Sequence, residues 1–250
     1  MGSTSEAAEI RDPQQALLSV VAMNVVLAGS TVGLFWAGVF VARSFGRKAE
    51  YSLAPLGFAR PKGGSPLGIG LGVLVGMGTL LVSRVVNPAS AFVLDRLGYS
   101  TESTVQRPFM RGLARWVEHS PDVAIPAIIF VVVIFGPAVE ELVFRGAIFN
   151  GLYRLGNLIQ RRKAGDSQAS MTKARRISFL LAALASSVLF AALHLEPVLV
   201  PALMILAISL CALFERTGSL LPSFVAHATF NSLAVFLIIL TGLGIFKVPV

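Results

Sequence analysis

The sequence predicts an all-α polytopic integral membrane protein with about six transmembrane helices, or seven to eight when short or interfacial helices are counted. Hydrophobic residues make up 55% of the 250 residues and charged residues 14%, and the mean hydropathy is +0.76. Soluble domains have about 45–50% apolar and about 25% charged residues. In addition, several segments approach the roughly 20 apolar residues that a transmembrane helix needs. An ordinary soluble domain and a disordered chain are both excluded.

Six apolar segments are separated by polar loops. They run over residues 16–42, 66–86, 123–137 with a mixed continuation, 177–195, 198–213 and 220–246. All should be helices, because lipid offers no other partner for backbone polar groups. The chain is thus divided into a polar N-terminal tail (1–15) and one transmembrane helical domain (16–250).

The stretch 87–120 has a different pattern. Four arginines, Arg96, Arg107, Arg111 and Arg115, alternate with Leu, Phe, Met and Trp. This pattern is typical of an amphipathic segment at the membrane surface. Either a single interfacial helix or a shallow pair of helices would satisfy it.

The net charge of +8 is concentrated in the loops. A basic charge in this setting indicates topology against an anionic membrane, so we expect lipids and not nucleic acid as partners. The positive-inside rule places the basic loops 43–62 and 161–176 in the cytoplasm. Alternation of six spans then places both termini outside.

The second apolar segment carries Gly68, Gly72 and Gly76 at a spacing of four residues. Small residues at this spacing lie on one helix face and let a neighbouring helix approach closely, so a packing role is expected. The only cysteine, Cys211, excludes an intrachain disulfide and a cysteine-based metal site.

Two adjacent carboxylates, Glu140 and Glu141, follow an unbroken apolar run. A charged residue at the centre of a span costs roughly 2.5–3.5 kcal/mol on insertion scales, so each needs compensation. Glu141 and Arg145 are four residues apart and can form an ion pair on one helix face. Glu140 is rotated by about 100° and has no cation at helix spacing. Gly136 and Pro137 predict a helix break, which would place both glutamates near a helix N-terminus.

Two of the three histidines also lie in apolar runs. His194 follows Phe190 by one helical turn, and Glu196 with the proline after it is expected to end that helix. His227 and Asn231 are four residues apart and face the same way. Either histidine alone is equally compatible with a role in helix packing. Together with the glutamates, however, these groups are able to activate a water and to hold an oxyanion.

The spacing of these groups along the chain also suggests a shared depth in the membrane. About twenty residues separate Glu140 from the basic loop 161–173, and about as many separate the loop from His194. A helical hairpin that turns in this loop would therefore place both side chains roughly 30 Å from the turn.

Three motifs in order resemble the CAAX protease and bacteriocin-processing family, which includes the type II CAAX prenyl endopeptidases and the Abi proteins. The first is a double glutamate, three residues and an arginine, here Glu140, Glu141 and Arg145. The second and third are Phe-x-x-x-His, here Phe190 and His194, and His-x-x-x-Asn, here His227 and Asn231. The resemblance covers about residues 123–240.

The resemblance implies an intramembrane endopeptidase with its catalytic cavity inside the helix bundle. Glu140 would be the general base on a water, helped by His194. His227 and Asn231 would stabilise the oxyanion, while Glu141, Arg145 and Phe190 would support the site. The substrate would be a peptide or a prenylated CAAX protein.

The same family pattern implies no cofactor. Two histidines and a glutamate are also a ligand set for zinc. The His-Glu-x-x-His motif is missing, however, so a metal-independent reaction is favoured.

Two other functions fit parts of the pattern. A transporter also uses buried ionisable residues, but transporters often contain internal repeats, and we find none in this sequence. A non-catalytic immunity or regulatory protein of the same fold would share the complete motif set. Sequence motifs of rhomboid and aspartyl intramembrane proteases are missing.

Overall fold

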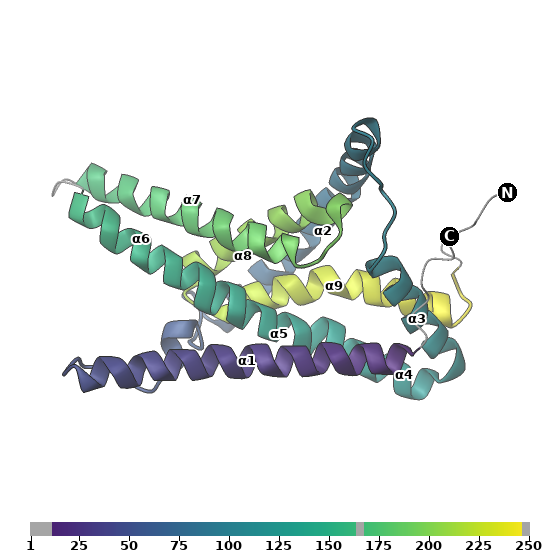
Figure 1. Ribbon diagram of the computed structural model, residues 1–250, viewed down its shortest axis with the longest axis horizontal. Helices are drawn as coiled ribbons and strands as arrows, with labels where there is room; N and C mark the ends of the chain where they lie inside the picture. Colours follow the sequence, from purple (N-terminus) through teal and green to yellow (C-terminus); the bar gives the residue numbers. More distant parts are fainter. Residues whose placement is uncertain (1–11, 164–167, 247–250) are drawn as a thin grey trace.

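The computed structural model describes residues 12–163 and 168–246, with the backbone alone for 161–163. Most of the predicted tail, residues 1–11, lies outside the described residues, and the first helix begins at Pro13. Within the described ranges the regular structure is helical, without strands (Figure 1). Six of these helices are long and apolar enough to cross a membrane. The predicted fold class is therefore confirmed.

Helix α1 (Pro13–Ser44) begins with a local cap. The Asp12 carboxylate accepts hydrogen bonds from the backbone N–H groups of Gln14 and Gln15, which would otherwise lack partners. Most of its apolar side chains are exposed, as expected for a helix surrounded by lipid. It lies along the third span at the edge of the bundle (Figure 1).

Helix α2 (Ser65–Arg96) is longer than predicted. The predicted end at residue 86 is wrong, because the helix continues through Pro88 for ten more residues. This extension exposes apolar residues such as Phe92 and Val93, which a membrane environment would stabilise. Only α3 (Gln106–His119) is a separate amphipathic helix, which settles the structure of the arginine-rich stretch.

The third span is helical from Pro121 to Gln160 without the predicted break. It consists of α4 (Pro121–Ile128), a π-helical segment (Ile129–Phe135), α5 (Gly136–Glu141), a second π-helical segment (Leu142–Phe149) and α6 (Asn150–Lys163). The N–H of Gly136 donates to the carbonyl of Val131, five residues back. This wider register accommodates Pro137, which cannot donate a hydrogen bond. The glutamates thus lie in mid-span and not at a helix N-terminus.

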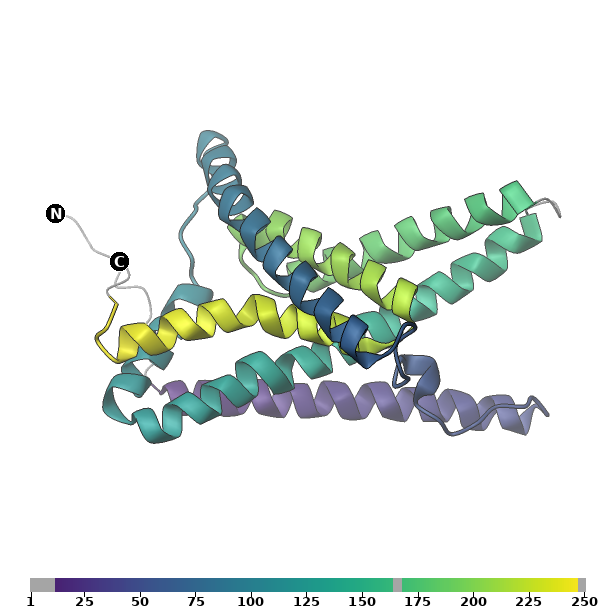
Figure 2. The same cartoon turned by 180° about the vertical axis from the view of Figure 1, so that it is seen from behind.

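Helix α7 (Gln168–Ala192) runs back along α6, and the two lie side by side in Figures 1 and 2. Phe144 on the third span contacts Phe190 on α7, with ring centroids 5.1 Å apart. This contact agrees with the hairpin predicted to bring Glu140 and His194 to a similar depth. The helix ends earlier than predicted, so His194 lies in the turn that follows it. A short 3₁₀ turn (Pro197–Leu199) leads into α8 (Val200–Thr217).

Helix α9 (Leu220–Gly242) packs against α2, α3, α8 and the third span. The packing role predicted for the glycines of α2 is confirmed where this helix contacts α9. A Cβ at Gly72 would lie 2.7 Å from the carbonyl oxygen of Pro222, and one at Gly76 would lie 2.5 Å from that of Ala226. These glycines allow two helix backbones to touch, which sets the position of α9 in the bundle.

The basic segments gather at one end of the molecule. Figure 1 shows the end of α1 and the α6–α7 hairpin on the same side. There Arg175 on α7 forms a 3.0 Å ion pair with Glu215 on α8, and Lys62 N donates to Thr217 O. The start of α1 and the end of α9 lie at the opposite end. The described parts of the loops 43–62 and 161–176 thus lie at one end, while residues 164–167 lie outside the described residues, and the cytoplasmic assignment of that end stays a prediction.

We expect Gly76→Ala to lower the melting temperature of the detergent-solubilised protein. The new methyl group would overlap the Ala226 carbonyl, and overpacking costs about 1–3 kcal/mol. Gly78→Ala is the matched control on the same helix, because a Cβ at Gly78 meets nothing within 4 Å. Equal melting temperatures for both variants would contradict the close approach of α2 and α9.

Cysteine labelling tests the membrane orientation. Lys48 and Ser100 are both exposed and lie before and after α2, a candidate membrane span, while the single native cysteine, Cys211, is buried. An impermeant maleimide added to intact cells should label Ser100→Cys and leave Lys48→Cys unlabelled until the cells are opened. The reverse pattern would invert the predicted topology.

Candidate active site

The centre of the site is a buried network of three charged or polar side chains. Arg145 Nη1 donates to Glu141 Oε1 at 2.9 Å, so the predicted i, i+4 ion pair is present. Glu141 and Arg145 are both 0% exposed. The same Glu141 Oε1 lies 2.9 Å from His227 Nδ1 of α9. The network therefore links the third span to α9.

The other nitrogen of this imidazole faces the second glutamate. An ionised carboxylate only accepts hydrogen bonds, so His227 Nδ1 donates to Glu141. His227 Nε2 then lies 3.6 Å from Glu140 Oε2. When the ring is neutral, His227 Nε2 and the Glu140 carboxylate both accept hydrogen bonds, so a donor is needed between them. A bridging water can be that donor. The Glu140 side chain is 30% exposed, in contrast to the sealed Glu141.

Phe190 packs the arginine and both histidines together. The Arg145 guanidinium lies over its ring, 4.7 Å from the centroid. The ring of His227 is 5.6 Å from the Phe190 ring and that of His194 is 4.8 Å from it. His194 Nδ1 lies 2.8 Å from Phe190 O, a carbonyl that only accepts, so Nδ1 donates and Nε2 is free to accept. His194 thus joins the group through Phe190.

Asn231 follows His227 by one turn of α9, and both side chains face the same way, as predicted, toward the third span. Its Nδ2 donates to Val132 O, at 3.1 Å, in the first π-helical segment. An amide nitrogen has two N–H donors, so one is left for a ligand. The structure therefore places Asn231 beside the glutamate helix, at a level different from that of Glu141.

Two π-helical segments flank the glutamates. Glu140 and Glu141 are the last residues of α5, between the segments 129–135 and 142–149. A π segment changes the angular offset along a helix, and such segments are often found at functional sites. Here they let Glu141 and Arg145 point into the core while Glu140, the neighbouring residue, faces a more open region.

A short loop covers the network on the side of Arg145. The 3₁₀ turn Ala54–Leu56 lies against the second π-helical segment, where a Cβ at Gly146 would be 2.6 Å from Leu56 O. Asn150 Nδ2 and Arg154 Nη2 both donate to Pro55 O, at 2.7 and 3.2 Å. The loop thereby shields the Arg145 side of the site from the basic end.

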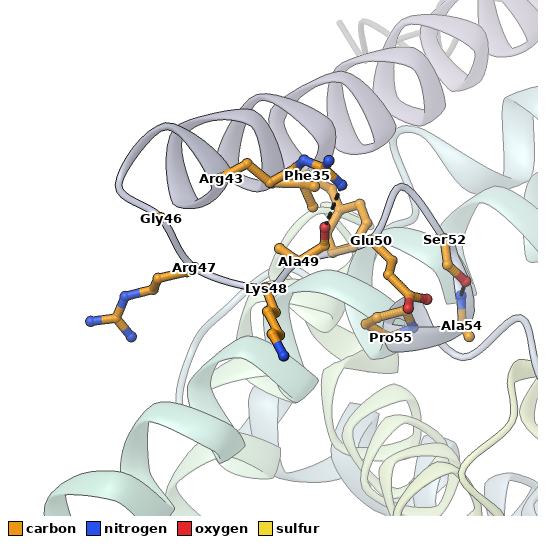
Figure 3. Close-up of a pocket in the computed structure, with 11 residues that line it drawn as sticks. Phe35, Arg43, Gly46, Arg47, Lys48, Ala49, Glu50, Ser52, Ala54 and Pro55 are labelled. Atoms are coloured by element: carbon orange, nitrogen blue, oxygen red, sulfur yellow. Dashed lines mark hydrogen bonds between the residues drawn. The ribbon is translucent and has the colours of Figure 1, made fainter.

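A cavity of about 870 Å³ lies apart from this network, at the C-terminal end of α1 (Figure 3). Its lining comes from residues 35–55 and includes Arg43, Lys48 and Glu50. Arg43 Nη1 donates to Ala49 O at 3.0 Å and so folds the loop over the helix end. None of the motif residues lines this cavity, which makes it unsuitable as the reaction site.

Within the part of the chain that the structure describes, no group of three or more His, Cys, Asp or Glu side chains is placed to hold a metal ion. The two ring nitrogens of His227 already face Glu141 and Glu140. The expectation of a metal-independent reaction stays a prediction, which a chelator tests below.

The hydrogen bond between Glu141 and His227 was not predicted, because 86 residues separate the two. Sequence spacing gave Glu141 one partner, Arg145, whereas the family resemblance implied an oxyanion role for His227. Glu196 was also missed as a contact residue and was assigned only to the helix end. A carboxylate next to an apolar run, two residues after a motif histidine, was the available signal.

We expect Arg145→Ala to destabilise the protein by about 3–5 kcal/mol, because it leaves the Glu141 carboxylate buried without its cation. Glu140→Gln should cost much less, since that side chain is partly exposed. Melting temperatures in detergent measure both effects. Arg111→Ala, on the exposed side of α3, is the control for loss of an arginine. A partial rescue of Arg145→Ala by Glu141→Gln should follow, and equal melting temperatures for Arg145→Ala and Glu140→Gln would contradict the buried pair.

Comparison with protein families matches residues 122–233 to the family described as type II CAAX prenyl endopeptidase Rce1-like. Comparison with curated proteins and with solved structures gives no match. The matched region begins with the third span and ends in α9 after Asn231, so it contains all three motifs. This region agrees with the resemblance predicted from the motifs. Over these residues, which make up less than half of the chain, the sequence is similar to the type II CAAX prenyl endopeptidase Rce1-like family.

Proposed function

We propose that the protein is an intramembrane endopeptidase in which Glu140 activates a water for attack on a peptide bond. The family generally comprises proteases, which supports the reaction class. The main observation from this chain is that its two adjacent glutamates differ in burial and in contacts. Glu141 is sealed between Arg145 and His227, whereas Glu140 is partly open and faces His227 Nε2 at 3.6 Å.

This division gives the two carboxylates different roles. Glu141 accepts from Arg145 and from His227 Nδ1, and so fixes the imidazole with Nε2 toward Glu140. A carboxylate that orients a catalytic imidazole in this way is a known arrangement in hydrolases. Glu140 has no arginine or lysine partner at helix spacing, so its lone pairs are available to a water.

The reaction is an ordinary hydrolysis. Glu140 accepts a proton from the water, whose oxygen bonds to the carbonyl carbon and forms a tetrahedral oxyanion. The C–N bond then breaks, and the proton held by Glu140 passes to the leaving amine. His227, when its ring carries both protons, donates from Nε2 to the oxyanion, and the second N–H of Asn231 adds a further donor. His194, whose ring also contacts Phe190, assists the water through Nε2.

The proposed substrate is the C-terminal region of a peptide or protein, such as a prenylated CAAX protein. Support for an apolar substrate comes from a groove of about 480 Å³ between α1 and the second π-helical segment. Leu34, Phe35 and Val143 are among the apolar residues in its lining, and Val143 is three residues after Glu140. An isoprenoid chain could reach this groove from the lipid.

We expect Glu140→Gln to abolish cleavage of a farnesylated CAAX peptide panel while the melting temperature stays close to that of the wild type. The amide cannot accept the proton of the water. Glu118→Gln, which changes an exposed glutamate of α3, should leave turnover unchanged. Peptide products are measured by mass spectrometry, with and without a chelator.

Each outcome of this experiment has a clear meaning. Turnover in Glu140→Gln comparable to the wild type would contradict the role of Glu140. Loss of wild-type activity with the chelator would contradict the metal-independent reaction. A folded wild type that cleaves no peptide, lipidated or not, would favour a non-catalytic immunity or regulatory role.

A further inference from the structure

Glu196, in the loop between α7 and α8, is a buried carboxylate outside the three motifs. It is 4% exposed. Its Oε1 accepts three hydrogen bonds, from Ser103 Oγ at 2.7 Å, Val105 N at 3.2 Å and Gln106 N at 2.7 Å. All three donors lie at the start of α3, at least 90 residues away in sequence.

These bonds make Glu196 a cap for α3 supplied by another part of the chain. The first N–H groups of a helix lack partners within it, and a negative charge there is also favoured by the helix dipole. The residue at the N-cap position, Val105, has no side chain that can accept. Ser103 completes the arrangement, since its Oγ accepts from Arg107 N at 2.9 Å while it donates to Glu196.

Helix α3 is a firm anchor for this contact. Its apolar face, with Leu113, Trp116 and Val117, is buried in a core cluster together with Val235 and Ile238 of α9. Leu113 and Val117 are fully buried. Because α3 packs on α9, a loop bound to the start of α3 is held in place relative to α9, the helix that carries His227 and Asn231.

The segment between Phe190 and Glu196 carries His194. Phe190 is fixed in the core at one end, and Glu196 is fixed by α3 at the other. Between them, Leu195 has a φ of 55°, in the left-handed region that non-glycine residues rarely adopt. Such a conformation persists only when the surroundings enforce it, and it often accompanies a functional constraint. The two anchors supply that enforcement and fix where His194 points.

We propose that Glu196 is a positioning residue for His194: by capping α3 from the α7–α8 loop, it holds the imidazole with Nδ1 on Phe190 O and its ring against Phe190. This inference rests on the proposed peptidase function for its effect on rate. The structural part, that Glu196 fixes the His194 ring, can be measured without turnover. Glu196 itself acts through the loop and takes no part in the chemistry.

The kinetic test is a double-mutant cycle in the full-length protein, with the farnesylated peptide as probe. Glu196→Ala should lower kcat by roughly 10–100-fold, the scale of a small displacement of a catalytic group, and leave KM nearly unchanged. In a His194→Ala background the same change should lower kcat by less than about 2-fold, because the group it positions is gone. Glu196→Gln, which keeps an acceptor, should restore part of the rate. Glu102→Ala, an exposed glutamate next to the cap, is the matched control and should leave kcat at the wild-type value.

A spectroscopic test is independent of activity. Nitrogen-15 spectra of the imidazoles should show a single Nδ1–H tautomer for His194 in the wild type and a mixture in Glu196→Ala. Hydrogen exchange at the Val105 and Gln106 amides should be faster in the variant. If Glu196→Ala fails to fold, Glu196→Gln provides the same comparison with a smaller expected effect.

The outcomes separate the two proposals. An unchanged kcat in Glu196→Ala, or an equal loss in both backgrounds, would overturn the positioning role and leave the peptidase function intact. An inactive wild type would overturn the peptidase function alone, and the tautomer of His194 would then decide the role of Glu196. An unchanged His194 tautomer in the variant would overturn the positioning role in either case.

Discussion

The hydrogen-bonded group of Glu141, Arg145 and His227 is the constraint on which the rest of the structure depends. A carboxylate inside a membrane protein needs a cation, and a cation that is 0% exposed needs the carboxylate in return. Since His227 binds the same oxygen as Arg145, α9 has to lie against the third span at one depth. The position of Glu140 relative to the imidazole follows from that depth.

Close helix packing makes this contact possible. Gly72 and Gly76 let α2 touch the backbone of α9, so α9 is confined between α2 on one side and the glutamate helix on the other. Gly72 and Gly76 lie outside the family match at residues 122–233, yet they support the helix that carries His227. The second span therefore contributes to the site by packing against α9.

Much of this could be predicted from the sequence, because it depends on local properties. Apolar length identified six spans, and a spacing of four residues identified the ion pair of Glu141 with Arg145. The contact between Glu141 and His227 depends on tertiary packing, which spacing along one helix does not contain. The break expected at Gly136 and Pro137 was wrong, since a π-helical turn absorbed the missing N–H. The contacts of Glu196 with the start of α3 were missed for the same reason as the contact of Glu141, because the partners are distant in sequence.

The sealed pair of Glu141 and Arg145 has a consequence for how such proteins change over evolutionary time. Losing either partner alone leaves a buried charge uncompensated, so a lineage that no longer needs catalysis is still selected to retain both. Glu140 is partly open and, among the described residues, forms no ion pair with an arginine or lysine, so its replacement leaves no buried charge uncompensated. Among descendants of a protein built this way, Glu141 and Arg145 would report inheritance of the fold. Under the proposed peptidase function, the residue at position 140 would report whether the chemistry is still in use.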